Sequence, residues 1–417
     1  MSTAAAETSS RYLDAAATAP LRTEARAAVL AVLDERQANP SSVHSPGHRA
    51  RASVDAARVE IASAFGAMPA EVVFTSGGTE ANNLAILGLA LANPRGRHLV
   101  TTPIEHPSVL ESCRYLERVM GFALTILRVD DRGRVDPAEA EAAIRTDTTL
   151  VSVGLANAEI GTVQAVPEIA AAAHARGALV HTDAVQAAAS LPVGFGGAGA
   201  SAWPGSDVDA MTIASHKFGG PQGAGALLVR RGLALEPVLH GGGQERGLRP
   251  GTENVAAIAG FAAAVRAHRE EGVGSRALAL GSSRDALISR LLAEIPGAHL
   301  TGDPQERLPG HASFVIRGVS GESLLVALDA AGFAVSSGSA CAAGMDEPSP
   351  ALLAIGLPAE LAQTAIRFTL AAPLDTRGID RVLAVLRAET EGRHHPGLET
   401  RARGATSPRV LDVTRRG

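Results

Sequence analysis

Lysine is nearly absent from this chain. Of 38 lysine and arginine residues, 37 are arginine, and the single lysine is Lys217. Arginine can replace lysine as a surface cation, but its guanidinium group stays charged and cannot attack a carbonyl as a neutral amine does. The retained lysine therefore indicates that a primary amine is needed, most commonly for a Schiff base. The alternative is an ordinary surface lysine that arginine enrichment left behind.

Cysteine, long apolar runs and excess charge are also scarce. The two cysteines, Cys113 and Cys341, form no CxxC or zinc-ligand spacing, so we expect no metal site and two thiols in a reducing compartment. No apolar run reaches membrane-spanning length, and residues 1–10 resemble neither a signal peptide nor a transit peptide. A formal net charge of −5 without long charge runs argues against nucleic-acid or membrane binding. We expect a soluble, cytoplasmic protein.

Predicted strands and helices alternate between residues 71 and 230. This alternation is typical of an α/β protein with a doubly wound, mostly parallel sheet. From Arg276 onward the pattern becomes α+β, which predicts a smaller second domain. Residues 194–199 formally match GxGxxG, but no helix follows, so we predict a surface loop over 194–206 and no dinucleotide site. The expected division is a large domain over 15–270, a small domain over 1–14 and 271–392, and a flexible tail over 393–417.

Polar residues follow several predicted strands, where α/β sheets bind their ligands. Lys217 comes after an apolar strand at 208–213 and before a glycine turn. Asp183 also ends a strand, where a carboxylate needs a cationic or hydrogen-bonded partner such as a protonated pyridine nitrogen. Its alternative role is a helix N-cap. His106 follows another strand, a position that favours ring stacking or proton transfer over a capping or core role.

The turn at Gly77, Gly78 and Thr79 lies between a predicted strand and a helix. Free amide groups and the positive end of the helix dipole make such a turn suitable for an anion, and the Thr79 hydroxyl adds a donor. A plain glycine turn with Thr79 as the helix cap is the alternative. Together with a Schiff-base lysine, the turn points to a phosphorylated aldehyde cofactor.

Two residues in the C-terminal third suggest further chemistry. Cys341 lies in a run of small residues at 336–344, which suits a thiolate that must travel to a substrate, although an exposed thiol without an activating neighbour stays mostly protonated. Cys113 falls within a predicted helix and is expected to be buried. Arg367 lies inside an apolar strand, where its planar cation suits a carboxylate. A structural ion pair is the alternative.

The chain resembles the cysteine desulfurases of the class V aminotransferase group, pyridoxal-phosphate enzymes of aminotransferase fold type I. The resemblance extends from about Tyr12 to Arg387. The matching motifs are Asn39-Pro-Ser-Ser, Thr75-Ser-Gly-Gly-Thr-Glu, Glu105-His, Asn157-Ala-Glu-Ile-Gly, His181-Thr-Asp-Ala-Val-Gln, Ser215-His-Lys, the glycine loop 240–252, Ser336-Ser-Gly-Ser-Ala-Cys and Ile366-Arg-Phe. The chain departs from the family at Ala214 and Ala158, where serine and asparagine are frequent. The serine stands one place later, as Ser215, so the resemblance leaves open which hydroxyl meets the phosphate.

The resemblance implies a role for each matching residue. Lys217 would hold pyridoxal 5′-phosphate, His106 would stack on its ring and move protons, and Cys341 would take sulfur from L-cysteine as a persulfide. The other implied cofactor-binding residues are Asp183 at the ring nitrogen, Gln186 at the ring hydroxyl, Gly78, Thr79, Ser215 and His216 at the phosphate, and Thr252 from the partner subunit of a homodimer. The implied substrate-binding residues are Asn157, Arg367 and Asn39.

The implied reaction converts L-cysteine to L-alanine and passes sulfur from Cys341 to an acceptor protein, in iron–sulfur cluster assembly, tRNA thiolation or a specialised pathway. A selenocysteine lyase or another class V enzyme would use the same Lys217, Asp183 and His106. From a different class, an inactive homologue would serve as a binding or scaffold subunit.

Overall fold

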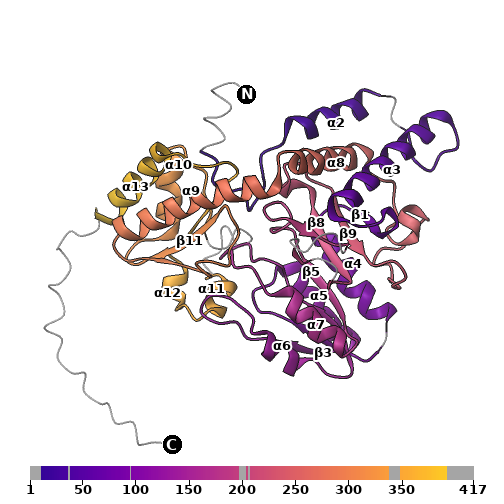
Figure 1. Cartoon of the computed structure of the whole chain (residues 1–417), viewed down its shortest axis with the longest axis horizontal. Coiled ribbons are helices and arrows are strands. Elements are labelled where there is room, and N and C mark those ends of the chain that lie inside the picture. Colours follow the sequence, from indigo (N-terminus) through magenta and orange to yellow (C-terminus); the bar gives the residue numbers. More distant parts are fainter. Residues whose placement is uncertain are drawn as a thin grey trace, which may run out of the picture.

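A computed structural model describes residues 11–35, 38–93, 95–196, 203–204, 207–337 and 348–391. Its centre is a seven-stranded sheet with the strand order β1-β9-β8-β5-β4-β2-β3 (Figure 1). Strand β9 is antiparallel to both its neighbours, β1 and β8, whereas β8, β5, β4, β2 and β3 are parallel. The predicted mostly parallel α/β sheet is therefore confirmed. The strands are β1 (Val72–Thr75), β2 (His98–Thr101), β3 (Ala123–Ile126), β4 (Thr148–Ser152), β5 (Leu179–Asp183), β8 (Ala210–Ala214) and β9 (Gly225–Val229).

Helices cover both faces of this sheet because the strands are apolar on both sides. Helices α4 and α5 bury one face with Val73, Leu99 and Leu150. Helices α3, α6, α7 and α8 contribute to the apolar cluster on the opposite face, which includes Val100 and Met211. The helices are α2 (Thr23–Asp34), α3 (Ser45–Phe65), α4 (Gly78–Ala92), α5 (Pro107–Met120), α6 (Pro137–Ala143), α7 (Val166–Ala175) and α8 (Val255–Glu270).

A second, three-stranded antiparallel sheet follows in the order β10-β11-β12. Helices α9, α10 and α13 bury it, and Leu13 from the N-terminal segment joins the same apolar cluster. Thr369 of β12 donates its backbone N–H to the Leu13 carbonyl at 2.7 Å, which fixes that segment on the small sheet. The elements are α9 (Val273–Glu294), β10 (Ala298–Leu300), β11 (His311–Ile316), α10 (Gly321–Ala330), α11 (Pro350–Ala354), α12 (Ala359–Ala362), β12 (Ala365–Thr369) and α13 (Thr376–Glu391).

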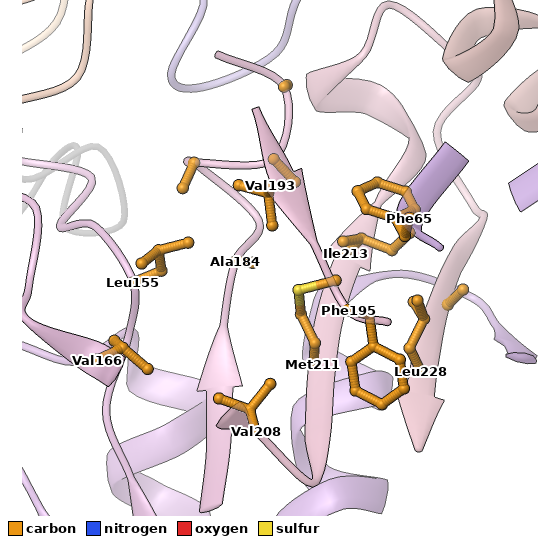
Figure 2. Close-up of a cluster of buried hydrophobic side chains, with 14 of the residues drawn as sticks. Phe65, Leu155, Val166, Ala184, Val193, Phe195, Val208, Met211, Ile213 and Leu228 are labelled. Atoms are coloured by element: carbon orange, nitrogen blue, oxygen red, sulfur yellow. The ribbon is translucent and has the colours of Figure 1, made fainter. Parts of the chain in front are cut away.

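Two local predictions meet different outcomes. The apolar sequence of residues 333–335 predicts a strand in the small domain, but this prediction is wrong, because the stretch forms only an isolated bridge of Ala334 with Tyr12. The segment after residue 192 is only in part a loop. Its strand β6 (Val193–Gly194) pairs with β7 (Trp203–Pro204). Phe195 then packs beside Met211 and Leu228 in the core (Figure 2), with the Arg230 guanidinium 4.0 Å above its ring. The domain boundaries stay a prediction.

In the described part of the chain, no helix is both long and apolar enough for a membrane span. The same residues contain no cluster of histidine, cysteine and acidic side chains suited to a metal ion.

Candidate active site

Lys217 lies directly beyond the end of β8, in the short 3₁₀ turn η3 (Ser215–Lys217). Its amine donates hydrogen bonds to the carbonyl oxygens of Ala16 and Ala17, the latter at 2.9 Å. Gln186, beyond the end of β5, donates to the same Ala16 carbonyl at 3.0 Å. The N-terminal segment therefore crosses the strand ends and brings Lys217 and Gln186 together. Both residues line a cavity that also includes Thr369 of the small sheet.

Asp183 ends β5, and both of its carboxylate oxygens have partners. Oδ1 accepts a hydrogen bond from the Val185 backbone N–H at 2.9 Å, which is the local turn that the capping alternative anticipates. Oδ2 accepts from Asn82 Nδ2 of α4 at 2.7 Å. Because Asn82 is only 1% exposed, it holds the carboxylate in a fixed position at the sheet edge.

His106 is the N-cap of α5, as the capping alternative anticipates, since its Nδ1 accepts from the Ser108 backbone N–H at 3.1 Å. Burial lowers the pKa of His106. The neighbouring Lys217 lowers that pKa further, whereas Asp183 opposes both effects. Asp183 and Lys217 therefore both lie within electrostatic reach of His106. The imidazole is neutral there, with its Nε2 edge uncommitted to the cap.

The turn before α4 has the properties of an anion site. Its N-cap is Gly77, which provides no side-chain cap for the first amide groups of the helix. Glu80 accepts from the Ser76 backbone N–H at 2.8 Å and pairs with Arg249 at 2.7 Å, so the turn is tied to the glycine loop. Burial alone raises the pKa of Glu80, but hydrogen bonds from Arg249 and Ser76 lower it below its usual value. Thr79 is exposed.

Ser215 and His216 flank the lysine on its N-terminal side. Ser215 Oγ is fully buried and has no hydrogen-bond partner among the described residues. His216 Nδ1 lies 2.9 Å from Thr18 Oγ1. Burial, with a further contribution from Lys217, lowers the pKa of His216 to about 4, so this imidazole is neutral and can donate to an anion.

Arg367 lies in β12 with only 2% of its side chain exposed. Its Nη2 pairs with Asp14 Oδ1 at 2.8 Å, and its Nη1 donates to the Ala158 carbonyl at 3.1 Å. The ion-pair alternative is therefore realised in this structure. Asn157 lies nearby in a turn, where its Oδ1 accepts from two backbone N–H groups and its Nδ2 donates to the Ile104 carbonyl at 2.6 Å.

Two predicted site residues are not brought into this cluster. Asn39 is exposed in the loop before α3, where its Oδ1 accepts from the Ser41 backbone N–H at 2.9 Å. Thr252 is exposed at the end of the glycine loop. A third predicted residue, Cys341, lies within 338–347, outside the described residues. Cys113 is buried as predicted, and burial raises the pKa of its thiol to about 12, with a contribution from Glu105.

Sequence reasoning missed three residues that shape the site, and it gave Glu105 no role although this residue belongs to a matching motif. Asn82 and Ser108 contact Asp183 and His106, Asp14 pairs with Arg367, and the half-buried Glu105 interacts with Asp183. Burial raises the Glu105 pKa to about 7, and Asp183 contributes, although hydrogen bonds from Gly154 and Thr102 oppose the rise. The available signal was helical spacing: Asn82 lies one turn after the anion turn, on the buried face of α4.

The residues present fit pyridoxal phosphate, the cofactor that the sequence implies. The primary amine of Lys217 suits the aldehyde, the carboxylate of Asp183 suits the ring nitrogen, and the uncapped start of α4 suits the phosphate. Close backbone contact supports this reading, because a Cβ on Gly78 would lie 2.9 Å from Val185 and a Cβ on Gly225 would lie 2.7 Å from Gly77. Glycine at these two positions therefore avoids close contacts at the turn before α4.

Comparison with known proteins gives consistent matches. A model of the family described as Aminotransferase class-V matches residues 11–382. A cysteine desulfurase IscS of Dictyoglomus turgidum is 43% identical over 376 residues, covering 90% of this chain and 93% of that protein. An IscS-like cysteine desulfurase of Mycobacterium tuberculosis is 41% identical over 401 residues, covering 94% and 97%. Among solved structures, an NifS-like protein has a TM-score of 0.81 and 33% identity, covering 90% of this chain and 97% of that chain.

Proposed function

This chain belongs to the class V aminotransferase family, and we propose that it is a pyridoxal-phosphate-dependent cysteine desulfurase. It removes sulfur from L-cysteine, gives L-alanine, and carries the sulfur as a persulfide on Cys341. The observation that carries the proposal is the convergence of Lys217, Asp183 and His106 at the carboxyl ends of one parallel sheet. An inactive binding subunit would not need this amine, carboxylate and neutral imidazole together.

When bound, the cofactor supplies an electron sink that weakens bonds at the substrate's α and β carbons. Lys217 would hold it through its aldehyde, and Asp183 would stabilise the positive charge on the ring nitrogen. Gln186 would contact the ring hydroxyl. The first amides of α4, with Thr79, Ser215 and His216, take the phosphate, because neutral His216 and the backbone N–H groups are hydrogen-bond donors.

Arg367 and Asn157 hold the substrate carboxylate in this proposal. Arg367 is pre-oriented by Asp14 and the Ala158 carbonyl, so its planar cation needs no rearrangement of its own strand. The resemblance also implies Asn39, but within one subunit this residue is exposed in the loop before α3. Neutral His106 carries a proton for exchange with the substrate at its ring.

Cys341 is the thiolate that attacks the substrate sulfur. A sulfur–sulfur bond forms, the carbon–sulfur bond breaks, and the electron pair released to carbon is protonated to give alanine. Cys113 cannot substitute, because it is buried and its thiol has a pKa of about 12. A working thiol needs a reducing compartment, which supports the cytoplasmic location that we propose.

The proposed active form is a homodimer in which Thr252 reaches the phosphate of the partner subunit. Support comes from the glycine loop, because contacts within the same subunit hold its buried part while its last residue is exposed and accessible to a partner. Glu245 of this loop is 3% exposed and accepts from Arg58 at 2.8 Å, while Thr252 at the end of the loop is exposed. The acceptor is a protein that takes sulfur from the persulfide, such as an iron–sulfur scaffold or a tRNA-thiolation protein.

Three variants test the activity. The purified protein should be yellow and should release sulfide and alanine from L-cysteine with a reductant. Lys217→Ala should lose the colour, because no other lysine exists in the chain. Cys341→Ser should keep the colour and lose sulfide release, whereas the matched control Cys113→Ser should keep both. Sulfide release that survives in Cys341→Ser would refute the persulfide route.

A further inference from the structure

A continuous line of hydrogen bonds joins Asp183 to His106 through two side chains without an assigned role. Asn82 Nδ2 donates to Asp183 Oδ2 at 2.7 Å and to Ser108 Oγ at 2.9 Å. Ser108 Oγ lies 2.6 Å from His106 Nδ1. Asn82 and Ser108 are 1% and 7% exposed, so the two central side chains of the line are shielded from water, whereas Asp183 is half-buried and His106 is exposed at its two ends. The line connects the strand end of β5 with the first turns of α4 and α5.

The donors and acceptors in this line have a single consistent direction. The Ser108 backbone N–H can only donate, and it points at His106 Nδ1, so that nitrogen carries a lone pair and no proton. The Ser108 hydroxyl must then also donate to Nδ1, and it accepts from Asn82. Asn82 spends its two N–H donors on Ser108 and on the Asp183 carboxylate. The proton of the neutral imidazole therefore resides on Nε2.

We propose that Asn82 and Ser108 are positioning residues that hold His106 as its Nε2–H tautomer and fix its ring relative to the Asp183 carboxylate. The proposal rests on the function proposed above, in which Asp183 meets the cofactor ring nitrogen and His106 stacks on the ring. Through this line, Asp183 and His106 would be held in a fixed position relative to each other. His106 consequently enters the reaction as a proton donor at Nε2.

The same line disfavours a positively charged His106. A proton on Nδ1 would face the Ser108 backbone N–H, which cannot accept it, and the hydroxyl would have to reverse and give up its bond from Asn82. Asp183 and Lys217 are the charged groups that act on the imidazole, with opposite effects. Loss of the Ser108 hydroxyl removes a bond made only to the neutral ring, so His106 should accept a second proton at higher pH.

Histidine nitrogen NMR of the full-length, cofactor-free protein tests the line without the reaction. With ¹⁵N-labelled histidine, and His106→Gln to identify the resonances, the unaltered protein should show the Nε2–H form. In Ser108→Ala and Asn82→Leu the titration of His106 should move to higher pH, and Ser108→Thr should restore it. The matched control is Ser112→Ala, because Ser112 lies one turn further along α5 and donates to the Ser108 carbonyl at 2.7 Å without contacting the imidazole.

The loaded enzyme provides the second measurement. In Ser108→Ala and Asn82→Leu we expect kcat for alanine formation to fall about tenfold, equivalent to about 1.4 kcal/mol, with KM little changed and the acid limb of the pH profile displaced upward. A tautomer and titration of His106 that are identical in all these proteins would overturn the proposal. Absence of alanine formation from the unaltered protein, with the NMR changes present, would instead refute the proposed function.

Discussion

Replacing Asp14 by asparagine should destabilise the free protein and increase its response to carboxylate ligands. Asp14 supplies the charged partner of Arg367, whose side chain is 2% exposed. Asparagine keeps the size and one oxygen acceptor but removes the negative charge. The guanidinium group would then be a buried cation without its direct counter-charge.

The structure sets the size of this effect. Breaking a buried ion pair costs about 3–5 kcal/mol. Arg367 keeps its 3.1 Å hydrogen bond to the Ala158 carbonyl, and it still interacts electrostatically with Glu159. The loss should therefore be at the lower end, about 3 kcal/mol of unfolding free energy. A bound substrate carboxylate would restore the missing charge, so ligand binding should gain part of this energy, and a tenfold lower KM corresponds to about 1.4 kcal/mol.

Urea unfolding with and without L-alanine measures both effects in Asp14→Asn and the unaltered protein. The double variant Asp14→Asn with Arg367→Met is the control, since it removes the uncompensated charge and should regain stability. Equal ligand-induced stabilisation in the single variant and the unaltered protein would show that Arg367 does not receive the substrate carboxylate.

Three further predictions follow from buried groups near the site. The pKa of Glu105 is raised to about 7, so its stabilising contribution is complete below the unfolded pKa near 4.5 and is lost as the pH rises through 7. The unaltered protein should therefore lose about 3 kcal/mol of unfolding free energy over this pH range, and Glu105→Gln should not, as urea unfolding at several pH values would show. Cys113 should resist iodoacetamide in the native protein and react after denaturation, as mass spectrometry of the peptide would show. Gly225→Ala should weaken pyridoxal-phosphate binding at least tenfold in a titration, because its Cβ would lie 2.7 Å from the Gly77 carbonyl carbon; unchanged affinity would mean that the turn yields freely.

The alternation of strands and helices was sufficient to predict the large sheet, because parallel strands are apolar on both faces and give unambiguous runs. The small sheet was harder. Residues 333–335 have strand-like composition, yet they form only one isolated bridge, of Ala334 with Tyr12, a residue far away in the sequence. β10 was missed because His299 is exposed and the strand has only three residues. Such short elements depend on tertiary pairing more than on local pattern.

The strand-end rule selected Lys217, Asp183 and His106 as candidate site residues, since each follows an apolar run that the sequence displays. The same rule could not find their supporting partners. Asn82 lies in the interior of α4, where a buried asparagine looks like an unfavourable helix residue until Asp183, 101 positions later, is placed against it. The partner of Arg367 was equally hidden, because Asp14 precedes it by 353 positions.

The N-terminal segment explains how two separate sheets form one site. Leu13 binds the small sheet, Asp14 pairs with Arg367, and the Ala16 and Ala17 carbonyls receive the Lys217 amine. In the proposed function, attachment of an aldehyde at Lys217 would require the amine to leave these carbonyl oxygens, so cofactor binding would be coupled to the same backbone segment that pairs with Arg367. A shift of this segment would therefore be transmitted to Arg367 through Asp14. Hydrogen exchange at residues 13–18 should accordingly differ between the cofactor-free and loaded proteins, and identical exchange would show that Lys217 releases the carbonyls without moving the segment.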